Sequence, residues 1–264
     1  MASTPQITDR ARAYHERMFP GYVSAFLRTD PEFIERFDNF AFDEVVNEAA
    51  GGADLPERTR FIAILAVLAG SQAVEEFGAM VPAALNFGVS PTEVKELIYQ
   101  ASAYLGIGRA FPFLNTVNDA LRARGIELPL PDQATTTPET RSSAGTEAQV
   151  AIFGERMRGF RESGTGRGAH INRWLTDHCF GDWYTRGGLS LADRELITFC
   201  LLYAQGGCEP QLRSHIAANI RLGTDADRLG KVVSQCVPFI GYPRSLNALA
   251  CIEQVEQESQ TAQA

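Results

Sequence analysis

Apolar residues recur along most of the chain at spacings of three and four residues, and the strict alternation typical of β-strands is nearly absent. Residues 90–106 begin with Ser90 as the N-cap, place Pro91 at the first helical position and complete a capping box with Glu93. Residues 190–207 begin with a similar Ser-x-x-Asp box and end at a pair of glycines, which is typical of a helix C-terminus. These patterns predict an all-α fold.

Two halves of the chain carry the same pattern. Residues 85–110 align with residues 219–245, and upstream residues 58–65 align with residues 192–199 after the shift of a single residue. Identical residues fall together at four places: Gly88 on Gly223, Gln100 on Gln235, Gly106 on Gly241 and Arg109 on Arg244. A self-similar unit of this length predicts a duplicated helical domain, because the repeats of solenoid proteins are shorter.

The duplication gives the domain boundaries. We expect a first unit over residues 1–127 and a second unit over residues 150–258. Residues 128–149 are rich in Pro, Ser and Thr and predict a linker between the units. Residues 259–264 predict a frayed C-terminal tail.

Composition narrows the class of protein. The chain of 264 residues is 45% hydrophobic and 21% charged, as in soluble globular proteins. Its formal net charge is −8 and it has no long basic run, so we expect neither nucleic acid nor a membrane surface as a partner. The longest apolar run, residues 61–70, is about half of the ~20 residues that a membrane span needs and predicts a buried helix.

Cysteine usage favours a cytoplasmic protein. The five cysteines are odd in number and lie scattered in apolar runs, unlike a disulfide framework. The N-terminal residues contain no apolar segment of the kind found in secretory signals. No Cys, His and carboxylate cluster has the spacing of metal ligands, and no Gly-rich phosphate loop is present, so no metal and no cofactor are expected.

The two units differ where chemistry would be expected. Three positions of the second unit carry groups capable of proton transfer or nucleophilic attack where the first unit has apolar residues: Glu195 for Phe61, Cys208 for Ala73 and His215 for Met80. Core packing alone does not account for three such differences together. The sequence therefore predicts that the second unit carries the chemistry and that the first has become scaffold.

The local geometry around Cys208 supports this prediction. Pro210 favours a helix that begins at or just before it, which leaves Cys208 at the helix N-terminus. The helix dipole is expected to lower the pKa of a thiol in that place. Gln211, His215 and Asn219 follow at four-residue spacing and share one helix face.

Two further segments contain candidate binding residues. Residues 178–188 are dense in aromatic and polar side chains, and Trp183 among them lines a pocket or belongs to an ordinary helix end. Residues 241–244, Gly-Tyr-Pro-Arg, place Tyr242 and Arg244 at another helix start, where Arg244 faces either a pocket or solvent.

At these residues the chain resembles the carboxymuconolactone decarboxylase family, which includes alkylhydroperoxidase D. The segments that carry the resemblance are residues 194–196, 208–223 and 239–250, and residues 83–106 match more weakly. The resemblance implies an all-α fold of helical hairpin units that assemble in rings of six. Two units on one chain then imply a homotrimer with a pseudo-sixfold ring.

The resemblance also implies two chemistries. In the decarboxylases, residues at the positions of Glu195 and His215 handle a proton without a cofactor. In the hydroperoxidases, the motif is Glu…Cys-x-x-Cys-x-x-x-His, and its two thiols reduce a peroxide. Gln211 stands here in place of the second thiol, so the dithiol cycle is incomplete.

The leading interpretation is a cofactor-independent lyase that acts on a small organic acid or lactone by decarboxylation or proton transfer. His215 would be the general acid, and Glu195 would orient it or act as a second acid or base. Cys208 would shape the pocket or donate a hydrogen bond, and Arg244 would hold a carboxylate. The first alternative is a thiol peroxidase in which Cys208 attacks the peroxide and Cys179 resolves the product. The second alternative is a catalytically silent protein that binds a small ligand or assembles with others.

Overall fold

The computed structural model describes residues 5–263, and every regular element within that range is a helix. The prediction of an all-α fold is therefore confirmed. The helices of the first unit are α1 (Asp9–Met18), α2 (Phe26–Thr29), α3 (Pro31–Asn39), the π-helix η1 (Phe40–Glu44), α4 (Val45–Asn47), α5 (Glu57–Gly70), α6 (Val74–Asn86), α7 (Pro91–Leu105) and α8 (Ile107–Ala123).

The second unit ends, like the first, in four helices that make up its core. Its helices are α9 (Arg141–Phe153), η2 (Glu155–Met157), α10 (Phe160–Ser163), η3 (Gly166–Gly168), α11 (Ala169–Trp174), the π-helix η4 (Leu175–Tyr184), α12 (Leu191–Gln205), α13 (Glu209–Arg221), α14 (Ala226–Ile240) and α15 (Tyr242–Gln263). The helices α12 to α15 begin 134 or 135 residues after α5 to α8, which matches the offset of the sequence repeat. Two copies of one helical unit thus follow each other along the chain.

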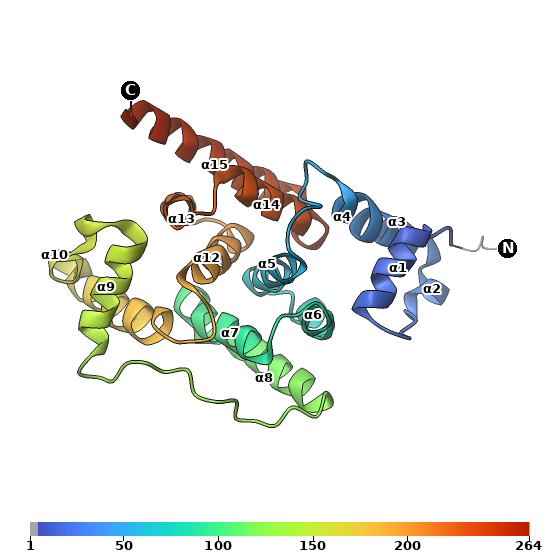
Figure 1. The fold of residues 1–264 in the computed structure, drawn as a ribbon, viewed down its shortest axis with the longest axis horizontal. Coiled ribbons are helices and arrows are strands. Elements are labelled where there is room, and N and C mark those ends of the chain that lie inside the picture. The colour runs from blue at the N-terminus through green and yellow to red at the C-terminus, as the bar shows by residue number, and fades with distance from the viewer. Residues whose placement is uncertain (1–4, 264) are drawn as a thin grey trace.

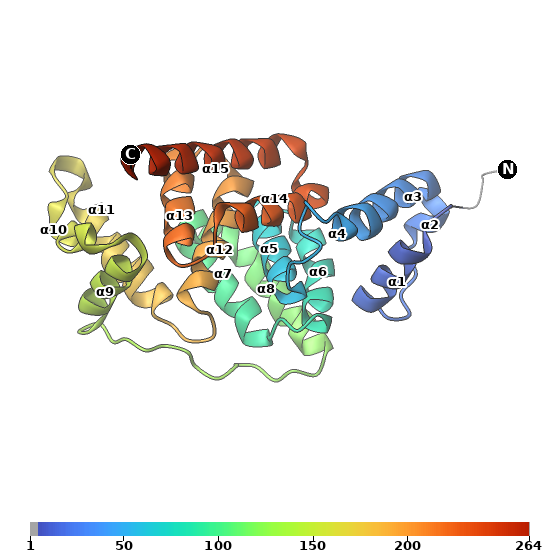
Figure 2. The ribbon, with the colours of Figure 1, turned by 45° about the horizontal axis from the view of Figure 1, so that its top comes forward.

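The two units pack around a central pair of helices, α5 and α12, rather than as separate bodies (Figures 1 and 2). Helix α7 of the first unit packs against α12 of the second, and α14 of the second packs against α5 of the first. The elements α1 to α4 lie at one end of the molecule, and α9 to η4 lie at the opposite end (Figure 1).

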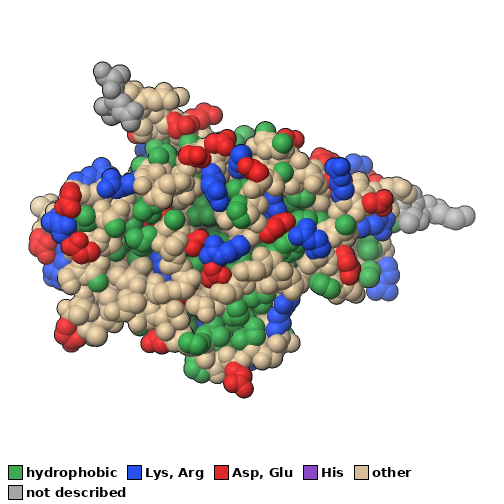
Figure 3. Space-filling view, viewed as in Figure 1, with side chains coloured by type: hydrophobic (Ala, Val, Ile, Leu, Met, Phe, Trp, Pro, Cys, Tyr) green, Lys and Arg blue, Asp and Glu red, His purple; other side chains and the backbone are tan. Residues whose placement is uncertain are grey.

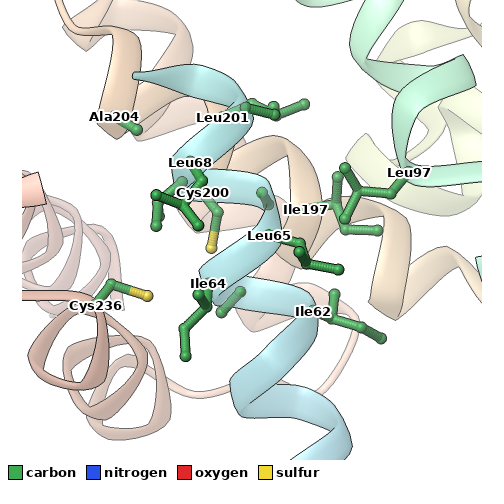
Figure 4. Packing of buried hydrophobic residues seen from close by; sticks show 14 of the residues in the cluster. Ile62, Ile64, Leu65, Leu68, Leu97, Ile197, Cys200, Leu201, Ala204 and Cys236 are labelled. Carbon is green, nitrogen blue, oxygen red and sulfur yellow. The ribbon is translucent and has the colours of Figure 1, made fainter. Parts of the chain in front are cut away.

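Helix α5 is the centre of the core. Residues 60–70 are buried on every side of the helix, as expected for one that is apolar all round. Its side chains Ile62, Leu65 and Leu68 pack among residues of α7 and α12, and Cys236 of α14 lies on the side of Ile64, away from Ile62 (Figure 4). A Cβ at Gly70 would lie 2.7 Å from the carbonyl oxygen of Leu201, so glycine permits the close approach of α5 and α12.

Charged side chains join the units at the helix starts. Both predicted capping boxes are present, at Ser90 and at Ser190. Arg58 donates to both carboxylate oxygens of Asp193 at 3.0 Å and also bonds Glu93, so one guanidinium links the boxes of α7 and α12. On the face shown in Figure 3, acidic and basic side chains are interspersed.

The linker is shorter than predicted. Residues 126–137 have no regular structure, but α9 begins at Arg141, so residues 141–149 belong to the second unit. A Cβ at Gly145 would lie 2.1 Å from the carbonyl oxygen of Thr176, which shows how closely α9 packs on η4. The predicted tail is also helical, because α15 extends to Gln263, and only Ala264 of that tail lies outside the described residues. Within residues 5–263, no helix combines the length and apolarity that a bilayer crossing requires.

Candidate active site

Glu195 and His215 form a buried pair between α12 and α13. His215 Nδ1 lies 2.6 Å from Glu195 Oε2, and the two side chains are 10% and 0% exposed. An ionised carboxylate only accepts hydrogen bonds, so the proton between them belongs to Nδ1. Nε2 is then the nitrogen that remains for a reacting molecule.

Asn219 holds the pair in place from one helical turn further on. Its Nδ2 donates to the backbone oxygen of Glu195 at 3.0 Å and to that of His215 at 2.8 Å. The second carboxylate oxygen of Glu195 is buried and has no hydrogen-bond partner within the described residues. Within the described residues, the carboxylate of Glu195 thus bonds through one oxygen to His215.

The histidine lies at the wall of a cavity of about 460 Å³. The walls come from α7, α9, η2, η4, α12 and α13. The lining residues with chemical or packing roles are Tyr104, Phe153, Arg156, Cys179, Cys208 and Gln211. The rings of Tyr104 and Phe153 meet the imidazole edge-on, with centroids 5.7 and 5.4 Å away. Arg156 is the cation among the lining residues, and it is exposed at the cavity wall.

A chain of hydrogen bonds orients the hydroxyl group of Tyr104. Gln100 Nε2 donates to the backbone oxygen of Arg194 and to Thr198 Oγ1, and its Oε1 accepts from Arg194, so both ends of the amide are fixed. Thr198 Oγ1 lies 2.6 Å from Tyr184 Oη, and Tyr184 Oη lies 2.8 Å from Tyr104 Oη, so the three hydroxyl groups form a hydrogen-bonded chain. When Thr198 donates to Tyr184 and Tyr184 donates to Tyr104, the hydroxyl proton of Tyr104 is left for the cavity.

Burial keeps these two tyrosines protonated. Loss of solvent raises the pKa of Tyr104 and of Tyr184 well above the ordinary value, and the charge of Glu195 adds to the effect. Tyr104 is thus a neutral hydrogen-bond donor beside the imidazole. It belongs to the first unit, so the cavity is built by both units.

Cys208 lies at the N-terminus of α13, as predicted, but the predicted lowering of its pKa is wrong. Burial raises the pKa of the thiol, and the neighbouring carboxylate of Glu209 adds to the rise. The thiol donates to the backbone oxygen of Leu202 at 3.4 Å, which favours the protonated form. Cys208 is therefore a neutral thiol in the cavity wall.

Cys179 lines the same cavity from η4 and is buried. Burial raises the pKa of its thiol to about 12. Its Sγ lies 3.8 Å from the hydroxyl oxygen of Tyr104. The two cysteines of the peroxidase interpretation therefore share one cavity, and both are protonated at neutral pH.

Five predicted site residues gather around this cavity: Glu195, Cys208, Gln211, His215 and Asn219. Arg244, Tyr242 and Trp183 do not. The start of α15 packs outside α12 and α13, so Arg244 lies against Gly206 and Tyr242 is 62% exposed. Trp183 turns away from the cavity, and its indole N–H donates to His178 Nε2 at 3.2 Å.

The first unit has no equivalent of the acid–base pair. Phe61 is fully buried and stacks on Phe87 with ring centroids 4.6 Å apart, and Met80 is 3% exposed. Among the residues that the structure describes, no group of three or more His, Cys, Asp or Glu residues is arranged to hold a metal ion.

Two candidate site residues were not predicted from the sequence. Tyr104 lies in the unit that looked like scaffold, and Arg156 lies in a short segment without helical periodicity. At the offset of 135, Tyr104 falls on Phe239, so the repeat comparison does contain a contrast there, whereas Arg156 lies outside the aligned segments. Only the packing of α7 and η2 beside α13 brings them to His215.

Comparison with known proteins agrees with this architecture. A model of the "Carboxymuconolactone decarboxylase family" matches twice, over residues 31–118 and 169–254, which together make about two-thirds of the chain. Over 118 residues the chain is 27% identical to the 4-carboxymuconolactone decarboxylase of Acinetobacter baylyi, a match that covers 44% of this chain and 87% of that protein. The chain therefore belongs to the carboxymuconolactone decarboxylase family, as a member with two tandem copies of the domain.

Proposed function

We propose that the chain is a lyase that decarboxylates a small organic acid or lactone, or shifts a proton on it, in the cavity beside His215. The observation that carries this proposal is the 2.6 Å contact between His215 and a fully buried Glu195 at the wall of a 460 Å³ cavity. A buried carboxylate that bonds one imidazole nitrogen leaves the other to exchange protons with a substrate.

The proposed reaction uses three groups of the cavity. Loss of CO₂ leaves an electron pair that must move into a conjugated carbonyl group of the substrate. The hydroxyl group of Tyr104 donates a hydrogen bond to that carbonyl oxygen as negative charge develops on it. Protonated His215 then delivers a proton from Nε2 to carbon, and Glu195 stabilises the charged imidazole before this step.

Arg156 takes the role that the sequence analysis gave to Arg244. Its guanidinium lies at the cavity wall, and among residues 5–261 no carboxylate forms an ion pair with it. It is therefore free to hold a substrate carboxylate that does not react. The apolar walls around Phe153 and Phe180 favour the departure of an uncharged CO₂ from a charged carboxylate.

The first test is turnover of 4-carboxymuconolactone, the substrate in the name of the Acinetobacter relative. In D₂O, the proposed reaction places one deuterium on the product carbon, which NMR detects. His215→Gln is expected to abolish both product and label. If this substrate is inert, a crystal soaked with small aromatic acids is expected to show density beside His215 Nε2. Turnover that survives in His215→Gln contradicts the proposal.

A thiol peroxidase is the second candidate, because Cys179 and Cys208 line one cavity. In that reaction the Cys208 thiolate displaces an alkoxide from a hydroperoxide and becomes a sulfenic acid, and Cys179 then forms a disulfide with it and releases water. An external dithiol must reduce the disulfide. The raised pKa of both thiols opposes the first step, so we rank this function below the lyase.

A further inference from the structure

A second cavity, of about 690 Å³, is lined mostly by the first unit and by residues 128–133, with Arg186 from the second unit. It is enclosed by α7, α8 and the extended residues 128–133, and it shares no lining residue with the cavity at His215. Its lining cations are Lys95, Arg122 and Arg186, and its lining carboxylates are Glu96 and Asp132. Thr92, Asn118 and Gln133 are its neutral polar residues, and Tyr99 and Leu128 are among its apolar ones. The proposed lyase reaction makes no use of this place.

Lys95 is a buried cation without a counter-ion. It is 9% exposed, and its Nζ donates to Asn118 Oδ1 at 2.7 Å. Among residues 5–261, no carboxylate forms an ion pair with it. Burial lowers the pKa of Lys95, and the nearby charge of Arg122 lowers it further. An ammonium group in such a place is costly unless an anion joins it.

The carboxylates around the cavity are already engaged. Glu96 accepts from Arg186 at 3.0 Å and from the buried Arg194 at 3.1 Å, so two cations share its charge. Asp132 is 80% exposed and lies 3.6 Å from Arg186. Arg122 pairs with Asp119 at 3.1 Å, so Lys95 is the lining cation that has no carboxylate partner among the described residues. The cavity therefore keeps an excess of positive charge in a chain whose net charge is −8.

One wall of the cavity suits a flat apolar group. The ring of Tyr99 lies 5.3 Å from Lys95 Nζ and 5.3 Å from the guanidinium carbon of Arg186. Leu128 and Leu130 line the cavity from the extended segment. A ring that stacks against these side chains would place an attached carboxylate near Lys95.

The second unit lacks this set of residues. At the offset of 135 that relates α7 to α14 and α8 to α15, the equivalents are Gly230 for Lys95, Ser234 for Tyr99, Glu253 for Asn118 and Gln257 for Arg122. Both cations and the aromatic ring are absent there. The first unit thus has Lys95 and Arg122 where the second has neutral residues, and the second has Glu195 and His215 where the first has apolar ones. Packing of the helices does not require either group of polar residues.

From these observations we propose that the cavity at Lys95 binds a small aromatic carboxylate. The carboxylate pairs with Lys95 Nζ, and the ring lies against Tyr99 and the apolar side chains of the extended segment. This site is separate from the one at His215 and does not depend on the function proposed for it.

The chain offers a direct probe, because Lys95 and Lys231 are its two lysines. Protein labelled with [ε-¹³C]lysine gives one NMR signal from each. We expect benzoate to move the Lys95 signal in a saturable way and to raise its titration midpoint, because the anion favours the charged ammonium. Lys231 pairs with Asp54 and Asp227 and serves as the internal control, with no expected change.

Three variants and two other probes sharpen the experiment. Lys95→Met should lose the stabilisation that benzoate gives to the wild type in thermal unfolding, whereas Lys231→Met should keep it. His215→Gln should leave the response of Lys95 unchanged, which separates the two cavities. Benzamide, the neutral analogue, should leave the Lys95 signal in place. A Lys95 signal that ignores saturating benzoate overturns the proposal, and an equal response to inorganic phosphate overturns the assignment of an aromatic ligand.

Discussion

The ring of Tyr104 from the first unit meets the imidazole of His215 from the second edge-on, with centroids 5.7 Å apart and planes at 78°. The first unit therefore contributes a wall and a hydroxyl group to the candidate active site. Although the first unit lacks the acid–base pair, it still forms part of the candidate active site.

The Tyr104 hydroxyl can be tested by a single-atom change. Tyr104→Phe keeps the ring but removes the donor, so we expect turnover to fall about 10- to 100-fold with a small effect on folding. Steady-state kinetics and thermal unfolding measure the two effects. Tyr203→Phe is the matched control, because Tyr203 is buried outside the cavity and should leave turnover unchanged. Equal rates for both variants would exclude the proposed role of Tyr104.

The same substitution at equivalent positions of the two units should have opposite effects. His215→Gln removes the proton-transfer group and should abolish turnover while the protein stays folded. Met80→Gln buries an amide at a 3% exposed apolar site and should lower the free energy of unfolding by about 1–3 kcal/mol with turnover retained. Activity assays and chemical denaturation check both. Two variants with the same rate and the same stability contradict the division of labour between the units.

Cys208→Ser separates the two candidate reactions. A lyase needs a small polar group in this wall, so the serine variant should keep much of the rate. A peroxidase needs the sulfur atom and should lose essentially all of it. Because the pKa of Cys208 is raised, we also expect its alkylation to be slow at neutral pH and to accelerate as the pH rises. Dithiol-dependent peroxide turnover that vanishes in both Cys208→Ser and Cys179→Ser would reverse our ranking.

Asp38 predicts a pH dependence of stability. Burial raises the pKa of this carboxyl group to about 6. In the unfolded chain the pKa of an aspartate is about 3.9, so the folded state binds the proton more tightly. The free energy of unfolding therefore falls as the pH rises from about 4 to about 6. Asp38→Asn removes this loss and should raise the melting temperature at about pH 7.5 but not near pH 4. A gain of the same size at both pH values speaks against the buried carboxyl group as the cause.

Assembly can be predicted from exposed apolar residues at equivalent positions. Ile107 and Phe111 begin α8, Tyr242 and Leu246 begin α15, and each is at least 55% exposed. A ring in which each unit offers the same contact would cover both pairs. Light scattering should then give three times the chain mass of 28.9 kDa. Phe111→Glu with Leu246→Glu should yield monomers, and a wild type that is already monomeric contradicts the ring.

The sequence alone predicted those features that depend on local pattern. The capping boxes at Ser90 and Ser190, the buried helix α5 and the start of α13 all follow from residues close in the chain. The pair of Glu195 and His215 was found because the other unit has Phe61 and Met80 there, a contrast that duplication supplies.

Features that depend on packing between distant segments were missed. The sequence places Arg244 at a helix start but does not show which face of α15 packs against α12. In the folded chain, that packing directs Arg244 away from the cavity. The pKa of Cys208 depends on burial, which its position at a helix N-terminus does not reveal. Tyr104 reaches His215 only because α7 crosses to the other unit.

The packing of each half against the other means that the folded molecule does not depend on an intact peptide link between them. Because α7 packs on α12 and α14 packs on α5, each half completes the core of the other. A protease cut within residues 132–137, which are exposed or half-buried and without regular structure, would leave two fragments held together as a heterodimer. The peptide link between the halves fixes their stoichiometry at one to one, while the core that they share holds them together.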